Sequence, residues 1–252
     1  MSDTSSPPDE RSRAPAPESE SAFARARARI YEVAADDSLA VEERQRRILE
    51  TGRAYLGVDN GHVERVVDEE THRVTVSVND DAEVVACGET FDRAKTFCRR
   101  TIEGESPLAV SDATTGAWEA DPAREARSLD CYLGAPISVE GEPYGTVCFV
   151  SRDSRAREFA PTERAFVELV ARLLGRLVAE RRHAETVAAH RRARDRTAAK
   201  YESLVAAAPD AVVVAEADSR RVVEANEAAS DLLGLPREEI IGRRIETFCP
   251  PA

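Results

Sequence analysis

Lysine is almost missing from this chain of 252 residues. Only Lys95 and Lys200 occur among the 35 basic residues, so the other 33 are arginine. Acidic residues number 47, which gives a net charge of −12 at neutral pH. Because Lys and Arg make most contacts to phosphates, this balance argues against nucleic acid as a partner. The acid excess and scarce lysine predict a surface adapted to high salt, an expectation that full folding in dilute buffer would refute.

Long apolar runs are also absent. No stretch approaches the roughly 18 consecutive apolar residues of a membrane-spanning helix, so none is expected. The N-terminal segment, residues 1–20, lacks the apolar centre of a secretory signal peptide. We therefore expect a cytoplasmic protein without a membrane partner.

The cysteines and histidines have no metal-binding spacing. The chain has no C-x-x-C pair, and the histidines are not clustered with the cysteines along the sequence. A metal site is therefore not expected, and the odd number of cysteines argues for reduced thiols. The cysteines are Cys87, Cys98, Cys131, Cys148 and Cys249, and the histidines are His62, His72, His183 and His190.

The N-terminal region changes in composition near residue 21. Residues 1–20 contain mostly Ser, Pro, Asp, Glu and Arg and are expected to be disordered, because they bury too little apolar surface. Residues 21–37 are rich in Ala and Arg and predict a helix. A second helix is expected to begin near Asp37 or Ser38, either of which suits an N-cap, and to end at Gly57.

Two hairpins are the main β-sheet signals. Val74, Val76 and Val78 alternate with polar residues, which predicts a half-buried strand paired with the valine-rich segment that starts at Val63. The second hairpin is expected from residues 132–150, with its turn around Gly141. Further expectations are a strand at 84–86, a helix over 90–103 that ends at Gly104, a strand at 108–110, and a loop with a small helix over 112–126.

A long helix is predicted to begin near Pro161. Its apolar positions recur at alternating steps of four and three, which is typical of a coiled coil and predicts a homodimer. Glu180, Arg191 and Arg194 occupy core positions and weaken the centre. The complete seam is Phe166, Val170, Leu173, Leu177, Glu180, Ala184, Val187, Arg191, Arg194, Ala198, Tyr201 and Val205.

Several segments resemble, in the correct order, a GAF domain, a small-molecule sensor fold related to PAS. Phe97–Leu108 followed by Val110-Ser111-Asp112 resembles the family's central helix, glycine turn, short strand and aspartate. Leu133–Ile137, Gly141, Gly145–Cys148, and Phe159 with Glu163 resemble its final hairpin and last helix. The resemblance covers residues 38–182, with the last helix from near 161. It implies an α+β fold with an antiparallel sheet and flanking helices.

The end of the chain resembles the first half of a PAS domain. This interpretation depends on Ala208-Pro209-Asp210, Asn226, Leu232-Leu233-Gly234 and the segment from Glu238 to Arg243. The expected organisation is a tail at 1–20, a helix at 21–37, the GAF-like domain at 38–182, a helical linker at 183–202 and a partial PAS-like α/β unit at 203–252. Such an order is typical of prokaryotic sensors, haloarchaeal ones included.

The resemblance implies a ligand cleft between the sheet and small helices, although plain core positions are the simpler interpretation of the same residues. The candidates are Phe97, Cys98, Asp112, Trp118, Cys131, Tyr132 and Cys148. The ligand and any cofactor are unknown. A bilin is not expected, because GAF domains that hold one use a Cys followed by His, whereas Cys131 is followed by Tyr132.

The expected function is signal transduction rather than catalysis. No kinase box or nucleotide-binding motif follows the histidines of the long helix, so the chain is interpreted as input to a kinase or regulator. The alternative is a thiol enzyme similar to free methionine sulfoxide reductase. That alternative would use Cys98 and Cys131, with Arg99 and Arg100 lowering a thiol pKa.

Overall fold

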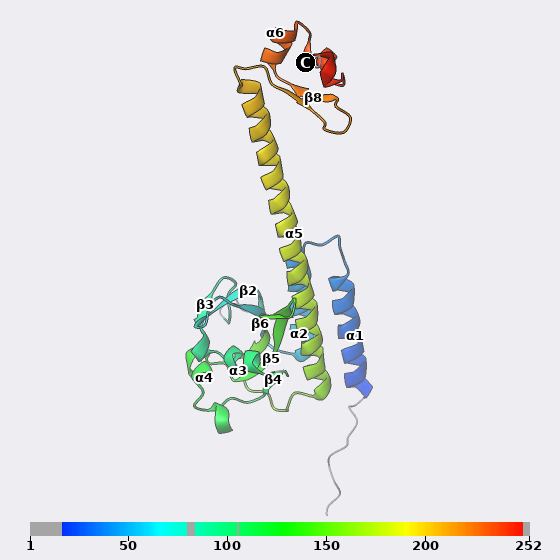
Figure 1. Cartoon of the computed structure of the whole chain (residues 1–252). Helices are drawn as coiled ribbons and strands as arrows, with labels where there is room; N and C mark the ends of the chain where they lie inside the picture. Colours follow the sequence, from blue (N-terminus) through cyan, green and yellow to red (C-terminus); the bar gives the residue numbers. More distant parts are fainter. Residues whose placement is uncertain (1–16, 80–83, 105, 249–252) are drawn as a thin grey trace, which may run out of the picture. The chain divides into compact units, whose positions relative to one another are not determined.

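The computed structural model describes residues 17–79, 84–104 and 106–248 (Figure 1). The chain divides into two compact units, Met1–Arg182 and His183–Ala252. The described part is mixed α and β, which confirms the α+β class. None of its helices has the length and apolar content that crossing a membrane requires.

The first unit is built around one antiparallel sheet. Its strands are β1 (Asn60–Val66), β2 (Thr71–Asn79), β3 (Thr90–Asp92), β4 (Leu108–Val110), β5 (Cys131–Val139) and β6 (Glu142–Ser151), in the spatial order β3-β2-β1-β6-β5-β4. Its helices are α1 (Pro17–Ala34), α2 (Val41–Leu56), α3 (Cys98–Glu103), α4 (Pro122–Arg127) and the start of α5 (Pro161–Ala207), with 3-10 turns η1 (Arg93–Lys95) and η2 (Gly116–Trp118). The pairing of β1 with β2 and of β5 with β6 confirms both expected hairpins.

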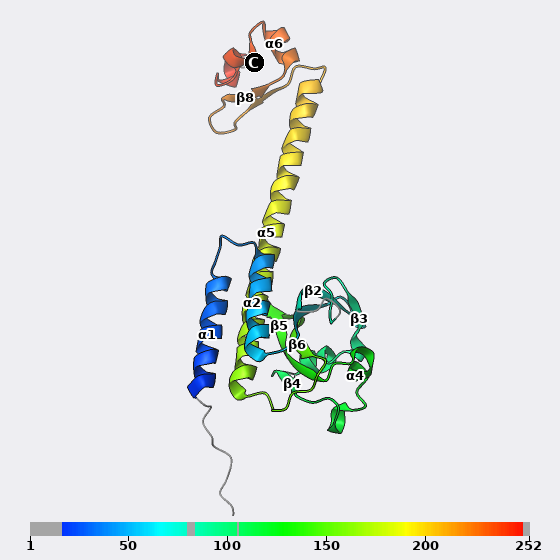
Figure 2. The same ribbon diagram turned by 180° about the vertical axis from the view of Figure 1, so that it is seen from behind.

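Different helices cover the two faces of this sheet (Figures 1 and 2). α1, α2 and the first part of α5 lie on one side, which we call the α5 face. α3 and α4 lie on the other side, the α3 face. Neighbouring residues of one strand alternate between the faces, so Tyr132 and Cys148 belong to the α3 face while Leu133 and Phe149 belong to the α5 face.

A glycine on α2 allows the helices to approach the sheet closely. A Cβ at Gly52 would overlap the ring of Phe149 on β6 and would lie 3.4 Å from the ring of Phe166 on α5. Both rings are fully buried. The ring of Tyr55 on α2 packs against that of Phe166 in a tilted arrangement, with 4.7 Å between the ring centroids. These contacts join β6, α2 and α5 into one packed layer.

The helix predicted over residues 90–103 is wrong in its first half. Thr90, Phe91 and Asp92 pair with β2 as the short strand β3, and the side chain of Asp92 accepts a hydrogen bond from Ala94 N to start η1. Only Cys98–Glu103 is α-helical. Residues 84–86 form no regular strand, and residues 80–83 lie outside the described part.

The N-terminal expectations also need correction. Of the tail predicted at residues 1–20, residues 1–16 lie outside the described part, and α1 already begins at Pro17. α2 begins at Val41, and its N-cap is Ala40 without a side-chain hydrogen bond. The Ser38 hydroxyl instead bonds Asp36, in the loop before the helix. The predicted end of α2 is confirmed, because Gly57 is the C-cap in the left-handed conformation.

The predicted seam of helix α5 is buried in its first part and mostly exposed in its second part. Phe166, Val170 and Leu177 are buried in the core of the first unit, so those positions face the chain's own sheet and helices. Glu180 accepts a hydrogen bond from the buried Arg44 of α2, which explains a charged residue at a seam position. Downstream of residue 182 the helix side chains are mostly exposed, Val187 among them.

The second unit contains a small two-stranded sheet and short helices. Its elements after α5 are β7 (Val213–Ala215), β8 (Val222–Ala225), α6 (Glu227–Leu233), α7 (Arg237–Ile240) and the turn η3 (Ile245–Thr247). The Asn226 side chain caps α6 through Ala229 N at 2.9 Å, and the same side chain donates to the carbonyls of Ala208 and Asp210. Gly234 ends α6 in the left-handed conformation, as the sequence predicts.

Candidate functional site

Strand β1 carries polar side chains into the interior. Asn60, His62 and Glu64 alternate with Gly61 and Val63, so the three polar residues point to the α3 face. All three are almost completely buried. A buried polar row on a central strand costs free energy unless its groups are paired, so it marks a site rather than ordinary core.

A β-bulge brings His72 to the same place. In the pairing of β1 with β2, Val63 lies opposite Val76, but Glu64 lies opposite Val74, so Thr75 is an extra residue. The extra residue reverses the alternation of β2, and His72 thereby shares the face of Glu64. The regular pattern of valines predicts one common face for residues 74, 76 and 78, and the bulge is the reason why that prediction is wrong.

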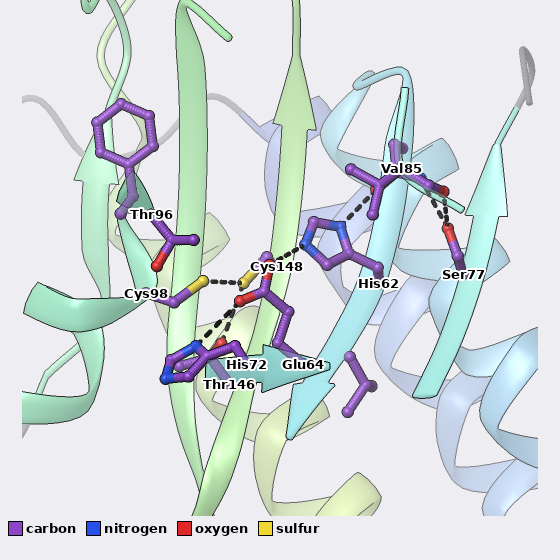
Figure 3. A network of polar contacts seen from close by, with 12 residues as sticks. His62, Glu64, His72, Ser77, Val85, Thr96, Cys98, Thr146 and Cys148 are labelled. Atoms are coloured by element: carbon purple, nitrogen blue, oxygen red, sulfur yellow. Dashed lines mark hydrogen bonds and ion pairs between the residues drawn. The ribbon is translucent and has the colours of Figure 1, made fainter. Parts of the chain in front are cut away.

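Glu64 lies between two histidines, as Figure 3 shows. Its Oε1 is 3.2 Å from Nε2 of His62, and its Oε2 is 3.2 Å from Nδ1 of His72. The other nitrogen of His62, Nδ1, is 2.5 Å from Oδ1 of Asn60. Nε2 of His72 is buried and has no hydrogen-bond partner among the described residues, which costs about 1–3 kcal/mol.

The charges in this group support each other. Burial opposes ionisation of Glu64, but hydrogen bonds from His62 and His72 outweigh it and hold the pKa of the carboxyl far below its usual value. Burial likewise opposes a charge on His72, but interactions with Cys98 and Glu64 raise the pKa of its imidazole to about 9. A carboxylate and a protonated histidine are thus stable together at neutral pH in the absence of any ligand.

Two thiols and a phenol complete the cluster. Sγ of Cys98 on α3 lies 3.3 Å from Sγ of Cys148 on β6. The Tyr132 hydroxyl lies 3.4 Å from Cys148 Sγ and 2.7 Å from the hydroxyl of Thr101, while Thr146 Oγ1 lies 3.2 Å from Cys148 Sγ. Burial, together with the neighbouring Cys148, raises the pKa of Cys98 well above its ordinary value, so its resting form is the thiol.

A small cavity adjoins the cluster. It measures about 20 Å³ and is bordered by His62, Glu64, Lys95, Cys98 and Tyr132, among others. A space of this size holds about one water molecule. In this conformation the cavity beside the cluster therefore admits a water-sized species and is too small for an organic ligand.

The structure brings together four of the seven candidate residues. Phe97, Cys98, Tyr132 and Cys148 belong to one buried cluster on the α3 face. Trp118 is partly buried beside them, with its ring 5.8 Å from that of Phe97 in an edge-on arrangement. Their location next to a cavity keeps them as ligand candidates, while their burial also satisfies the plain core interpretation.

Cys131 and Asp112 lie elsewhere. Cys131 packs in the core of the α5 face, and burial raises the pKa of its thiol to about 11. It precedes Tyr132 in strand β5, so alternation sends the two side chains to opposite faces. Asp112 bonds the backbone and hydroxyl of Thr114 and forms a local turn. Cys98 and Cys131 therefore do not share a site.

The arginines after Cys98 are directed to a different partner. Arg99 and Arg100 both pair with the buried Asp121, at 2.6 and 3.3 Å, and Asp121 also caps α4. Burial opposes ionisation of Asp121, but these contacts outweigh it and lower the pKa of the carboxyl. Both guanidinium groups pair with Asp121, and the pKa of the Cys98 thiol is raised by burial rather than lowered.

Sequence reasoning missed the polar half of the site. It did not select His62, Glu64, His72, Thr101 or Thr146 as site residues. Histidines and cysteines that are not clustered along the sequence come together in space, because His72, Glu64 and Cys98 present ligand atoms within 4.8 Å of one another. The alternation of Asn60, His62 and Glu64 on a buried strand is the signal that could have found it.

Comparison with family models assigns the two units. The model of the GAF domain matches residues 40–178, which is more than half of the chain. The chain belongs to the GAF domain family. A model of the PAS domain matches residues 199–252. Both are sensory domains, so the chain is a sensory signalling module. A search of curated proteins found no match to the chain.

Solved structures of low sequence identity share the GAF fold. The GAF domain of a phosphoenolpyruvate-protein phosphotransferase from Coxiella burnetii is 18% identical, with a TM-score of 0.53 over 67% of this chain and 98% of that one. The chromophore-binding domain of a bacteriophytochrome from R. palustris is 12% identical, with a TM-score of 0.56 over 69% and 65%. A phycoerythrobilin-bound GAF domain from a cyanobacterial phytochrome is 16% identical, with a TM-score of 0.50 over 66% and 97%.

Proposed function

We propose that this chain is the input part of a sensor histidine kinase or transcriptional regulator. The GAF domain receives a small molecule or an oxidant at the buried cluster on its α3 face. The signal changes the packing of α5, which runs on toward the PAS segment as a helical linker.

One observation carries this proposal: strand β6 touches both the cluster and α5. Cys148 lies 3.3 Å from the Cys98 sulfur, and the next residue, Phe149, packs over Gly52 beside Phe166 of α5. Since interiors are close-packed, a shift of β6 at Cys148 displaces the ring of Phe149 as well. A chemical change on one face of the sheet thus has a short route to the helix on the other face.

The pair of thiols suits an oxidant that is small and uncharged. Hydrogen peroxide is close to water in size, and the cavity beside Cys98 holds about one water. Peroxide would break its O–O bond and leave as two waters, while both thiols lose their protons and one S–S bond forms. Closing the sulfur separation of 3.3 Å to a bond length of about 2.05 Å pulls α3 toward β6. The raised pKa of Cys98 predicts a slow reaction, because the thiolate is the nucleophile.

Hydrogen–deuterium exchange of the full chain tests the route. We expect peroxide to change amide exchange in the N-terminal half of α5, residues 161–178, as well as in α3. Cys148→Ser should abolish the change, and Cys87→Ser, which removes an exposed thiol, should retain it. A disulfide that forms without altered exchange in α5 would refute the coupling.

The downstream part of α5 supports a homodimer. Val187, Tyr201 and Leu204 are exposed, with Leu204 at 64%. Val187 and Tyr201 are two heptads apart, so they share one stripe that a second copy of the helix would cover. Light scattering at tens of micromolar tests this proposal, and a monomer would contradict it.

The alternative, a methionine sulfoxide reductase, has less support. Its two expected cysteines, Cys98 and Cys131, lie on opposite faces of the sheet, and both thiols are buried. Turnover of free methionine sulfoxide by the parent chain, lost in Cys98→Ser, would revive it.

A further inference from the structure

Three buried residues of different chemistry meet on the α3 face of the GAF domain. Glu64 comes from β1, His72 from β2 and Cys98 from the first turn of α3. One ligand atom from each lies within 4.8 Å of the other two. In Figure 3 the carboxylate, the imidazole and the Cys98 sulfur point toward one another.

We propose that Glu64, His72 and Cys98 bind one divalent metal ion of the zinc class. This inference deepens the proposed function by naming a ligand for the same site. Metal binding itself, however, does not require that the domain signals.

The donor set matches that class of ion. Oxygen, nitrogen and sulfur ligands together are typical of Zn²⁺, whereas Mg²⁺ and Ca²⁺ take oxygen ligands. A carboxylate, a thiolate and a neutral imidazole carry a charge of minus two, so one divalent cation makes the buried site neutral. A neutral buried site avoids the free-energy cost of an unpaired buried charge.

The distances suit a compact coordination shell. Zinc bonds of about 2.0–2.3 Å in a tetrahedron place neighbouring ligand atoms about 3.3–3.8 Å apart. Glu64 Oε2 and His72 Nδ1 already lie 3.2 Å apart, so little movement is needed between them. The three residues come from the paired strands β1 and β2 and from the start of helix α3.

Neighbouring groups hold the carboxylate and leave one position open. His62 binds the second oxygen of Glu64, and Asn60 in turn fixes the ring of His62. Outer partners of this kind orient metal ligands. The cavity of about 20 Å³ borders Glu64 and Cys98, so a water can fill the fourth coordination position.

Cobalt titration of the full chain tests the site. The protein is reduced, stripped with a chelator and carries Cys87→Ser, which removes the one cysteine that is exposed among those in the described part of the chain. We expect one Co²⁺ per chain, with a thiolate-to-cobalt band in the near ultraviolet and strong visible bands typical of tetrahedral geometry. One equivalent of Zn²⁺ should displace the cobalt and raise Tm.

Matched variants assign the ligands. Cys98→Ser should abolish the thiolate band, whereas Cys148→Ser, whose sulfur is only 3.3 Å away, should keep both the band and the affinity. Glu64→Gln and His72→Gln should each weaken Co²⁺ binding at least about tenfold. Loss of the band in Cys148→Ser, or its persistence in Cys98→Ser, would overturn the assignment.

A measurement on the parent chain tests the metal site even if the variants fail to fold. X-ray absorption of the zinc-loaded protein should detect one sulfur at about 2.3 Å and nitrogen or oxygen atoms at about 2.0–2.2 Å. A shell without sulfur, or one with two sulfurs, would contradict the three-ligand site. If cobalt binds as expected but peroxide leaves the exchange of α5 unchanged, the proposed signalling route fails while the metal site stands.

Discussion

The two faces of the GAF sheet are built from the same strands but differ in what they bury. The α5 face holds large apolar side chains such as Leu133, Phe149 and Phe166. The α3 face holds a smaller core in which thiols, a phenol and a buried carboxylate pack together. Because alternate residues point to opposite sides, neighbours in sequence serve different purposes. One face supplies most of the apolar burial, and the other gathers groups with chemistry.

The largest effect is expected on the α5 face. Phe149→Ala removes a fully buried ring that packs over Gly52, so the GAF domain should lose about 3–5 kcal/mol of unfolding free energy. Urea unfolding followed by circular dichroism measures the loss. Val67→Ala, at a residue that is 46% exposed, is the control and should change stability by less than about 0.5 kcal/mol. If Phe149→Ala lowers the free energy of unfolding by less than about 1 kcal/mol, the α5 face does not contribute more stability than the α3 face.

A smaller loss is expected from the buried carboxylate of the α3 face. In the presence of a chelator, Glu64→Leu should cost about 2–3 kcal/mol, because His62 and His72 lose their charged acceptor. Glu142→Gln, an exposed change in β6, should have almost no effect. Equal stability of parent and Glu64→Leu would mean that the cluster contributes nothing to folding.

The α5 side also has a buried carboxylate, and its pH response sharpens the comparison. Glu163 accepts hydrogen bonds from Arg155, Arg157 and Ala160 N. Burial opposes its ionisation, but these bonds outweigh it and hold its pKa below the ordinary 4.5. A lowered folded pKa stabilises the protein above about pH 4.5, and that stability is lost as pH falls through the folded pKa.

We therefore expect the free energy of unfolding to fall more steeply in the parent than in Glu163→Gln as the pH is lowered from about 6 to below about 4. Chemical unfolding at a series of pH values measures this difference. Arginine stays protonated over this range, so the carboxyl alone titrates in this group. Parallel pH profiles of parent and variant would contradict the expectation.

The smallest expected change in stability is the difference between substitutions of a buried and an exposed cysteine. Cys148 is completely buried and Cys87 is exposed. Cys148→Ala should cost about 1 kcal/mol, as for loss of one buried methyl-sized group, and Cys87→Ala less than about 0.5 kcal/mol. Thermal unfolding in reducing buffer compares them. Equal shifts in Tm would show that the thiol of Cys148 is not tightly packed.

Sequence patterns predicted the elements that depend on local rules. The hairpins follow from strict alternation, and the end of α2 follows from the conformational freedom of Gly57. The strand β3 was not predicted, because three residues are too few to show a periodic pattern. These residues are extended only because they pair with β2. Long-range pairing, which a single segment does not encode, decided that region.

The site, too, was predictable only where local patterns were enough, and not where its geometry depends on a partner strand. Phe97, Cys98, Tyr132 and Cys148 were selected through family resemblance and lie together. His72 was missed because one extra residue in β2 reverses which face it occupies, and a bulge depends on the partner strand.

The scarcity of lysine offers direct chemical access to the site. Lys95 borders the cavity, and 62% of its side chain is exposed, with its ammonium 3.7 Å from Oδ2 of Asp92. The second lysine, Lys200, lies on α5 in the other compact unit. An amine-reactive dye therefore has few lysines to attach to, and Lys200→Arg leaves Lys95 as the one lysine of this sequence. A fluorophore at Lys95 would report occupancy of the cavity in a protein whose positive side-chain charge is otherwise carried mainly by arginine.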